Sequence, residues 1–337
     1  TSIHSLMLKM SSNATVFVTR NDVPTCALDL LREHFQVKVN PNDGIITREE
    51  LLKGVKGVDG IFCLLSDRID EDVVKSAGTS LKTVCTMSVG YDHIDLAVMK
   101  SHGIKVGYTP DVLTDSVAEH TVGLLLATAR NFFSANKEIF NGGWQKNNCC
   151  PVWMLGGEIR NSIVGIFGLG RIGLAIMKRL ASFDVKEFLY TSRSDKVSAV
   201  QYGARRVSID ELASSSDYII IACALTPETK EVFNKNIFKK MKKSSYLVNI
   251  SRGGVIQQDD LIEALKNNQI AGAGLDVMTP EPLPSDHPLT KLSNCSKYCI
   301  SLYTIHYRNS KLCPLSLTLF WNNLFFECFS TKHKHNR

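Results

Sequence analysis

Residues 163–173 read Ile163-Val164-Gly165-Ile166-Phe167-Gly168-Leu169-Gly170-Arg171-Ile172-Gly173. The apolar run 163–167 predicts a buried strand, and the apolar periodicity of residues 174–183 predicts a helix. Between them the glycines have the spacing G-x-G-x-x-G, which in this strand–turn–helix context is typical of a dinucleotide-binding fold. The first glycine permits a tight turn, the second lets the backbone approach a pyrophosphate, and the third lets helix and strand pack closely. Because the helix N-terminus offers N–H groups to phosphates, we expect cofactor binding by Gly168, Gly170, Arg171, Ile172 and Gly173.

About twenty residues further on, the next predicted strand ends at Thr191-Ser192-Arg193-Ser194. An NAD enzyme usually carries a carboxylate here, which binds the ribose 2′-hydroxyl. A guanidinium flanked by two hydroxyls instead suits a 2′-phosphate. We therefore expect Ser192, Arg193 and Ser194 to bind NADP(H) in preference to NAD(H), the alternative being a surface arginine without a ligand.

Two series of alternating strands and helices run along the chain. The first has predicted strands at 16–18, 61–65, 81–85 and 104–106, with helices at 49–55 and 94–101. The second has strands at 163–167, 188–191, 218–223, 247–250 and 273–277, with helices at 174–183, 212–214, 237–241 and 259–267. Alternation of this kind predicts parallel sheets covered by helices, that is, two doubly wound α/β domains. One long helix over residues 115–133 connects the two series.

Length and composition agree with this organisation. The 337 residues suit about two domains at about 150 residues each. Hydrophobic residues make up 44% and the net charge is +6, which exclude a disordered or fibrous chain and do not favour nucleic acid. The ten cysteines show no zinc-site spacing, so we expect no metal and reduced, buried thiols at Cys63, Cys85 and Cys223. Residues 1–13 contain no apolar core of secretory type, so we expect a cytoplasmic protein.

Two further charged motifs follow strands of the second series. Ser251-Arg252-Gly253 follows the strand at 247–250, and Asp276 and Glu281 follow the strand at 273–277. The carboxyl ends of parallel strands form the crevice in which such sheets bind ligands. Arg252 suits a bidentate contact with a carboxylate, and either acid suits a proton relay, although charges at strand ends are often only solvated.

These motifs, in this order, resemble the D-isomer-specific 2-hydroxyacid dehydrogenase family, and within it the branch that reduces glyoxylate and hydroxypyruvate. The resemblance covers residues 16–295. It rests on residues 87–93 (Met-Ser-Val-Gly-Tyr-Asp-His), 107–115, the glycine motif, 250–253 and 281–284 (Glu-Pro-Leu-Pro).

The resemblance implies roles for single residues. Val89 and Gly90 match a loop whose N–H groups bind the substrate carboxylate, and Arg252 matches the catalytic arginine. Glu281 matches the acid that orients the catalytic histidine and raises its pKa. Asp276 matches a residue near the nicotinamide carboxamide, and Ala224 and Ile250 match positions against the cofactor.

The resemblance also implies an architecture. A flavodoxin-like substrate domain (1–108) and a Rossmann-like NAD(P)-binding domain (109–295) would form the active site in a cleft between them. The family is usually a homodimer through the helix matching 115–133, and its partner is a small 2-keto or 2-hydroxy acid.

The chain departs from the family after Cys295. The family continues with a short strand and then Pro-His-Ile-Gly-Ser, whose histidine donates the proton to the carbonyl. Here residues 296–337 look like a non-family tail, consistent with a translated intron or a splice product, and His306 is a loose substitute for the histidine. The apolar run 312–329 contains Pro314, Asn322, Asn323 and Glu327, so we expect no membrane span.

The sequence thus predicts NADPH-dependent reduction of glyoxylate or hydroxypyruvate to the D-2-hydroxy acid. The alternative is a catalytically weak or inactive dinucleotide-binding protein, similar to the corepressors that share this fold.

Overall fold

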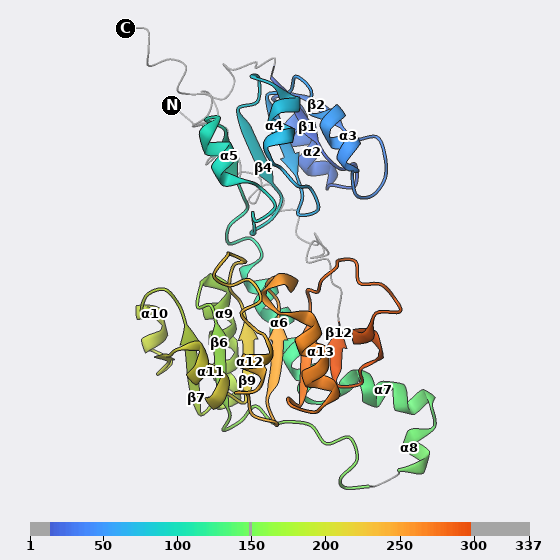
Figure 1. Ribbon diagram of the computed structural model, residues 1–337, viewed down its shortest axis with the longest axis vertical. Helices are drawn as coiled ribbons and strands as arrows, with labels where there is room; N and C mark the ends of the chain where they lie inside the picture. The colour runs from blue at the N-terminus through green and yellow to red at the C-terminus, as the bar shows by residue number, and fades with distance from the viewer. Residues whose placement is uncertain (1–13, 148–149, 298–337) are drawn as a thin grey trace. The chain divides into compact units, whose positions relative to one another are not determined.

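The computed structural model describes residues 14–147 and 150–297 (Figure 1). They form two compact units, which divide between residues 112 and 113. Each unit has its own parallel sheet, so the predicted class of two doubly wound α/β domains is confirmed. His306 and the rest of the predicted tail from residue 298 lie outside the described residues.

Unit 1 is built on a five-stranded sheet in the order β2-β1-β3-β4-β5, the flavodoxin-like order. Its strands are β1 (Thr15–Val18), β2 (Gln36–Val39), β3 (Gly60–Cys63), β4 (Thr83–Thr86) and β5 (Lys105–Gly107). Its helices are α2 (Thr25–Arg32), α3 (Arg48–Gly54), α4 (Glu71–Ala77) and α5 (Leu96–Ser101). Apolar side chains of α3, α4 and α5 form the core on one face of the sheet, and those of α2 pack on the other.

Unit 2 is built on a seven-stranded sheet in the order β12-β11-β10-β9-β6-β7-β8, which is the Rossmann order with one added strand. Its strands are β6 (Ile163–Phe167), β7 (Glu187–Thr191), β8 (Arg205–Arg206), β9 (Tyr218–Ile221), β10 (Tyr246–Asn249), β11 (Gly272–Leu275) and β12 (Cys295–Lys297). Its α-helices are α6 (Thr114–Ala129), α7 (Phe132–Phe140), α8 (Gly143–Lys146), α9 (Arg171–Leu180), α10 (Val197–Val200), α11 (Ile209–Ser215), α12 (Lys235–Phe238) and α13 (Gln258–Lys266). Short 3-10 turns η1 (Ala181–Phe183), η2 (Gly253–Val255) and η3 (Pro288–Lys291) complete the unit.

The core of unit 2 has two layers, one on each face of the sheet. In β9, Ile219 and Ile221 pack against α11, α12 and α13, whereas Tyr218 and Ile220 pack with α6 and α9. Successive side chains of a strand point to opposite faces, so a fully apolar strand supplies both layers. This is why the second series of strands is visible as continuous apolar runs in the sequence.

The long helix predicted over 115–133 is wrong at its C-terminal end. Helix α6 ends at Ala129, and Asn131 has a left-handed backbone with φ of 54°. A left-handed residue interrupts the α-helical hydrogen bonds, and asparagine tolerates this conformation better than most residues. The chain then begins a separate helix, α7.

Edge strands were missed because they lack an apolar signature. In β8, Arg205 and Arg206 are both exposed, as is common for charged residues that protect a sheet edge. In β12 the strand continues to Lys297, two residues beyond the predicted domain end at 295, and pairs with β11. The ammonium of Lys297 is half-buried and donates to the carbonyls of Leu289 at 2.6 Å and Leu292 at 3.2 Å, so a lysine ends a strand that is part of the sheet.

Candidate cofactor and substrate site

The turn between β6 and α9 has the shape that the glycine pattern predicts. Gly168 has φ of +101°, and a Cβ built on it would lie 2.7 Å from the Cα atom of Cys223. A Cβ on Gly173 would lie 2.6 Å from the carbonyl oxygen of Gly168. Gly170, in contrast, faces open space. The turn is therefore closed on the protein side and open at its middle glycine, where a pyrophosphate would approach.

The N-terminus of α9 is open to a ligand. Its N-cap residue is Gly170, and no side chain caps the helix there. The helix is fixed by its other end and face, because Ile176, Met177 and Leu180 are buried. Arg171 is exposed and Ile172 is half-buried. An uncapped helix N-terminus with a glycine cradle fits the phosphates of a nicotinamide dinucleotide.

The loop after β7 is held by an arginine that sequence reasoning missed. Arg206 donates from Nε to the carbonyl of Ser192 at 2.9 Å and from Nη2 to the carbonyl of Arg193 at 3.2 Å, and its Nη1 lies 3.5 Å from Asp195. The Ser192 hydroxyl donates to the carbonyl of Ser194. Arg193 and Ser194 are exposed. The loop thus presents a guanidinium and a hydroxyl to solvent on a braced backbone.

The segment after β9 lies behind the glycine turn. Burial raises the pKa of the Cys223 thiol to about 11. Ala224 is exposed, and its carbonyl accepts from the Thr229 hydroxyl at 2.7 Å. Cys63, Cys85 and Cys223 form no disulfide, as predicted; the first two are buried and the third is half-buried.

Asn249 shapes the Ser-Arg-Gly turn from inside the sheet. Its buried amide donates to the carbonyl of Arg252 at 2.9 Å and accepts from the backbone N–H and the hydroxyl of Ser251, at 3.0 and 2.9 Å. Arg252 itself is half-buried and donates to the carbonyl of Ser251 at 2.8 Å. Ile250 is buried directly after β10. The direction of the Arg252 backbone therefore depends on a neighbouring amide.

The turn of Arg252 and the loop of Glu281 touch each other. A Cβ on Gly253 would lie 2.1 Å from the carbonyl oxygen of Met278, so only a glycine permits this approach. The Glu281 carboxylate accepts from the Met278 N–H at 2.7 Å. This contact explains why the two motifs occur together.

Gln258 braces the loop of Glu281 from α13. Its Oε1 accepts from the N–H of Thr279 at 2.9 Å and its Nε2 donates to the carbonyl of the same residue. Nε2 also lies 3.3 Å from Nε2 of His287. A glutamine in a helix gives no motif, so its part in the site was not predicted from the sequence.

Asp276 is buried one residue beyond the end of β11. Its carboxylate lies 3.1 Å from Nε2 of His120, on α6, and both side chains are shielded from water, with exposed fractions of 2% and 13%. Its backbone N–H donates to the carbonyl of Asn249. Unit 2 thus brings Asp276, Ile250, Arg252 and Glu281 to the carboxyl ends of its strands.

In unit 1 the predicted substrate loop is held by hydroxyls. The Ser88 hydroxyl donates to the carbonyl of Gly90 at 2.6 Å and lies 2.7 Å from the Thr86 hydroxyl. The carbonyl of Ser88 accepts from the N–H of Thr109 at 2.9 Å. Val89 and Gly90 are half-buried. The backbone of the loop is therefore fixed before any ligand binds.

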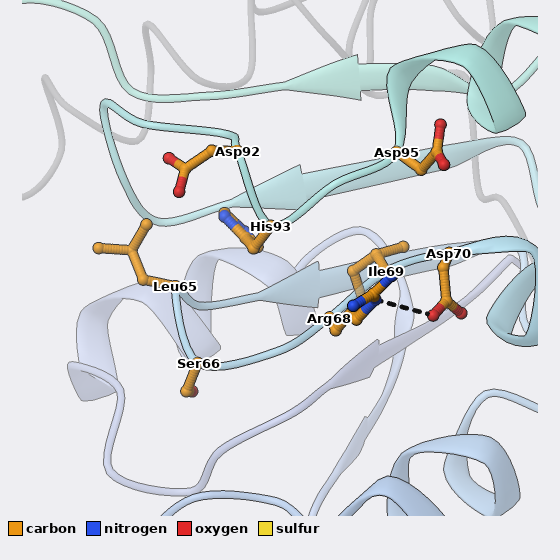
Figure 2. Close-up of a pocket in the computed structure, with 8 residues that line it drawn as sticks. All are labelled: Leu65, Ser66, Arg68, Ile69, Asp70, Asp92, His93 and Asp95. Atoms are coloured by element: carbon orange, nitrogen blue, oxygen red, sulfur yellow. Dashed lines mark ion pairs between the residues drawn. The ribbon is translucent and has the colours of Figure 1, made fainter. Parts of the chain in front are cut away.

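A pocket of about 390 Å³ lies beside this loop in unit 1. Figure 2 shows its lining, which comes from the segment after β3 and from the residues that follow the substrate loop: Leu65, Ser66, Arg68, Ile69, Asp70, Asp92, His93 and Asp95. The lining includes three carboxylates and one guanidinium, and Asp70 is paired with Arg48 and Arg68. Burial acts to raise the pKa of Asp70, but the hydrogen bond and charge of Arg48 outweigh it and lower that pKa. This lining does not suit an anionic 2-keto acid, and it does not include Val89 or Gly90.

No cluster of three or more His, Cys, Asp or Glu side chains that could hold a metal occurs within residues 14–147 and 150–297. No helix in this part of the chain is long and apolar enough to cross a membrane.

Comparisons with known proteins agree with this geometry. The sequence model of the D-isomer specific 2-hydroxyacid dehydrogenase, NAD binding domain, matches residues 122–298. The chain is 49% identical over 282 residues to a glyoxylate reductase/hydroxypyruvate reductase of Homo sapiens, covering 83% of this chain and 85% of that protein. It is 44% identical over 281 residues to a glyoxylate reductase of Thermofilum pendens, covering 83% and 82%.

A solved structure gives the same result. It is an NADPH-dependent glyoxylate/hydroxypyruvate reductase from Sinorhizobium meliloti in complex with NADP and malonate, which matches with a TM-score of 0.77 at 28% identity, over 94% of this chain and 93% of that one. The glycine turn, the contact between the motifs of Arg252 and Glu281, and these relatives lead to one conclusion: the chain belongs to the D-isomer specific 2-hydroxyacid dehydrogenase family of NAD(P)-dependent oxidoreductases.

Proposed function

We propose that the chain reduces glyoxylate or hydroxypyruvate to the D-2-hydroxy acid with NADPH. The observation that carries the proposal is the contact of Gly253 with Met278, which joins the loops of Arg252 and Glu281. These loops lie at the carboxyl ends of the strands, as does the glycine turn. One hydride and one proton are added to the keto group, and NADP⁺ is released. Bound NADPH supplies the hydride to the 2-keto carbon.

Arg252 binds the substrate carboxylate in this proposal. Its planar fork matches the two carboxylate oxygens, which fixes one face of the carbonyl toward the hydride. In unit 1, the loop that Ser88 holds offers the N–H groups of Val89 and Gly90 to a substrate carboxylate. Glu281, held by the N–H of Met278, orients the acid that donates the proton.

Arg193 selects NADPH in this proposal. A guanidinium and the Ser194 hydroxyl would bind the 2′-phosphate, while Arg206 keeps their backbone in place. Ala224, Ile250 and Asp276 complete the cofactor site. The relative from Sinorhizobium meliloti was solved with NADP, which supports the same cofactor here.

A second candidate is a dinucleotide-binding protein with little or no turnover. The sequence after Lys297 favours it, because the family's Pro-His-Ile-Gly-Ser does not follow β12. Loss of a positioned general acid lowers a rate by about 10²–10⁴-fold. His306 is the first histidine after β12 and is the one that would replace the family's histidine.

We also propose that the chain forms a homodimer through α7 and α8. One side of helix α6 is buried within unit 2, with Leu124 and Leu125 in the core. Helix α7 has no buried residue, and Phe132, Phe140 and Trp144 are more than half exposed. Apolar side chains gathered in this way are typical of a protein interface. Light scattering would test this, since Phe140→Ser with Trp144→Ser should give a monomer.

The decisive assay follows NADPH absorbance after hydroxypyruvate or glyoxylate is added to the full chain. A second protein carries Pro-His-Ile-Gly-Ser after Lys297, because β12 already supplies the strand that precedes this sequence in the family. Turnover of both forms, faster in the graft, supports the proposal. Turnover of the present chain at the rate of the graft would show that another group donates the proton. NADPH binding without turnover in either form would favour the second candidate.

A further inference from the structure

The pair formed by His120 and Asp276 joins two segments 156 residues apart in the sequence. His120 lies in α6 and Asp276 follows β11, within the same unit. An ionised carboxylate can only accept hydrogen bonds, so Nε2 of His120 is the donor. Within residues 14–147 and 150–297, the structure shows a hydrogen bond from His120 to Oδ1 of Asp276 and shows none to Oδ2. One carboxylate oxygen is thus held and the other is left for a ligand.

The packing of α6 on β11 fixes this pairing. A Cβ on Gly274 would lie 2.6 Å from the Thr128 hydroxyl and 3.0 Å from Cγ of Leu124, so the helix rests directly on the strand at this glycine. From Leu124 to His120 the helix advances one turn, about 6 Å. From Gly274 to Asp276 the strand advances two residues, about 6.6 Å. The matched advance places His120 beside Asp276.

We infer that His120 is a positioning residue, which holds the Asp276 carboxylate so that its second oxygen accepts a hydrogen bond from the nicotinamide carboxamide. This inference rests on the proposed function, in which Asp276 meets that carboxamide. A buried carboxylate without a donor would reorient toward water or another donor, since an unmet buried acceptor is costly. His120 prevents this and orders the reacting end of the cofactor site.

The test compares two ligands by calorimetric titration of the full-length protein. NADP⁺ carries the nicotinamide, and 2′-phospho-ADP-ribose lacks it but keeps every contact with the glycine turn and Arg193. His120→Ala removes the donor, His120→Leu removes it while filling the space, and His120→Gln keeps an N–H at a similar reach. The control is His102→Ala, an exposed histidine paired with Glu71 in unit 1. Asp276→Ala serves as the reference for the proposed contact.

We expect His120→Ala and His120→Leu to lower the affinity for NADP⁺ by about 10-fold, because one hydrogen bond to a charged group is lost. The affinity for 2′-phospho-ADP-ribose should change by less than about twofold. His120→Gln should restore NADP⁺ binding, and His102→Ala should change neither ligand. Equal losses for both ligands, or no loss for either, would overturn the inference. If Asp276→Ala weakens NADP⁺ alone and the His120 variants do not, the role of His120 falls and that of Asp276 stands. If Asp276→Ala also leaves NADP⁺ unchanged, the placement of Asp276 in the proposed function fails.

Discussion

The first strand–helix turns of the two units differ in whether their backbone is accessible to a ligand. In unit 2 the turn from β6 to α9 contains three glycines, and the helix begins at an uncapped Gly170. In unit 1 the turn from β1 to α2 reads Thr19-Arg20-Asn21-Asp22-Val23-Pro24 and contains no glycine. There the Thr19 hydroxyl donates to the buried carboxylate of Asp67, and Arg20 is paired with Asp22. The N-cap of α2 is Pro24, which has no N–H to offer.

The two turns show that a doubly wound sheet does not by itself bind a nucleotide. Both units place a helix N-terminus without a side-chain cap after their first strand, but the unit 1 turn has no glycine at which a pyrophosphate could approach the backbone. Unit 2 keeps its turn open and supports it from behind with Cys223. The difference assigns the cofactor to unit 2. Substitutions at Gly168, Arg252, Arg193 and Arg206 and one labelling experiment test the parts of unit 2 on which that assignment and the proposed chemistry rest.

The largest effect is expected from Gly168→Ala. The alanine would have to adopt the left-handed backbone of Gly168, and its Cβ would overlap Cys223. We therefore expect the free energy of unfolding to fall by about 1–3 kcal/mol and NADPH binding to be lost. Thermal unfolding and calorimetric titration measure the two effects. Asp22→Ala in the corresponding turn of unit 1 is the control and should leave NADPH binding unchanged. Normal NADPH affinity in Gly168→Ala would remove the turn from the cofactor site.

Arg252→Lys tests the chemical end of the unit 2 sheet. A lysine keeps the charge but cannot reproduce the planar fork, so we expect kcat/KM for hydroxypyruvate to fall by about 10- to 100-fold while NADPH affinity is kept. Steady-state kinetics and a binding titration separate these outcomes, and the exposed Arg160→Lys is the control. Unchanged kinetics would show that Arg252 does not hold the substrate.

Arg193→Ala tests the adenosine end. We expect NADPH binding to weaken by about 1–3 kcal/mol, the value of a hydrogen bond to a charged group, with NADH binding unchanged. Arg206→Ala should also weaken NADPH binding, because it removes the hydrogen bonds to the backbone carbonyls of Ser192 and Arg193. Equal losses for both cofactors would mean that this loop does not recognise a 2′-phosphate.

The smallest effect concerns the support behind the glycine turn. Because burial raises the pKa of Cys223 to about 11, about one thiol in 1,000 is ionised at pH 8, and alkylation requires the thiolate. Iodoacetamide should therefore modify the exposed Cys150 long before Cys223. The rate at Cys223 should rise with pH until about pH 11. Rapid labelling of Cys223 at pH 8, followed by mass spectrometry, would show that this support is looser than the structure indicates.

Residues that carry a motif could be predicted from the sequence, and residues that act on them could not. Gly168, Arg252 and Glu281 follow strands in a recognisable order. Asn249, Gln258, His120 and Arg206 hold these motifs through bonds that depend on which strands and helices are neighbours. The end of α6 depends on the backbone of one asparagine, which periodicity does not reveal.

Hydrogen–deuterium exchange of the full chain with and without NADPH tests the assignment of the cofactor to unit 2 most directly. The account predicts slower exchange in peptides covering residues 168–176 and 192–195, where the phosphates and the 2′-phosphate would bind. It predicts no change in the peptide covering residues 19–25 of unit 1. Protection of the unit 1 turn, or unchanged exchange at the glycine turn under saturating NADPH, would contradict it.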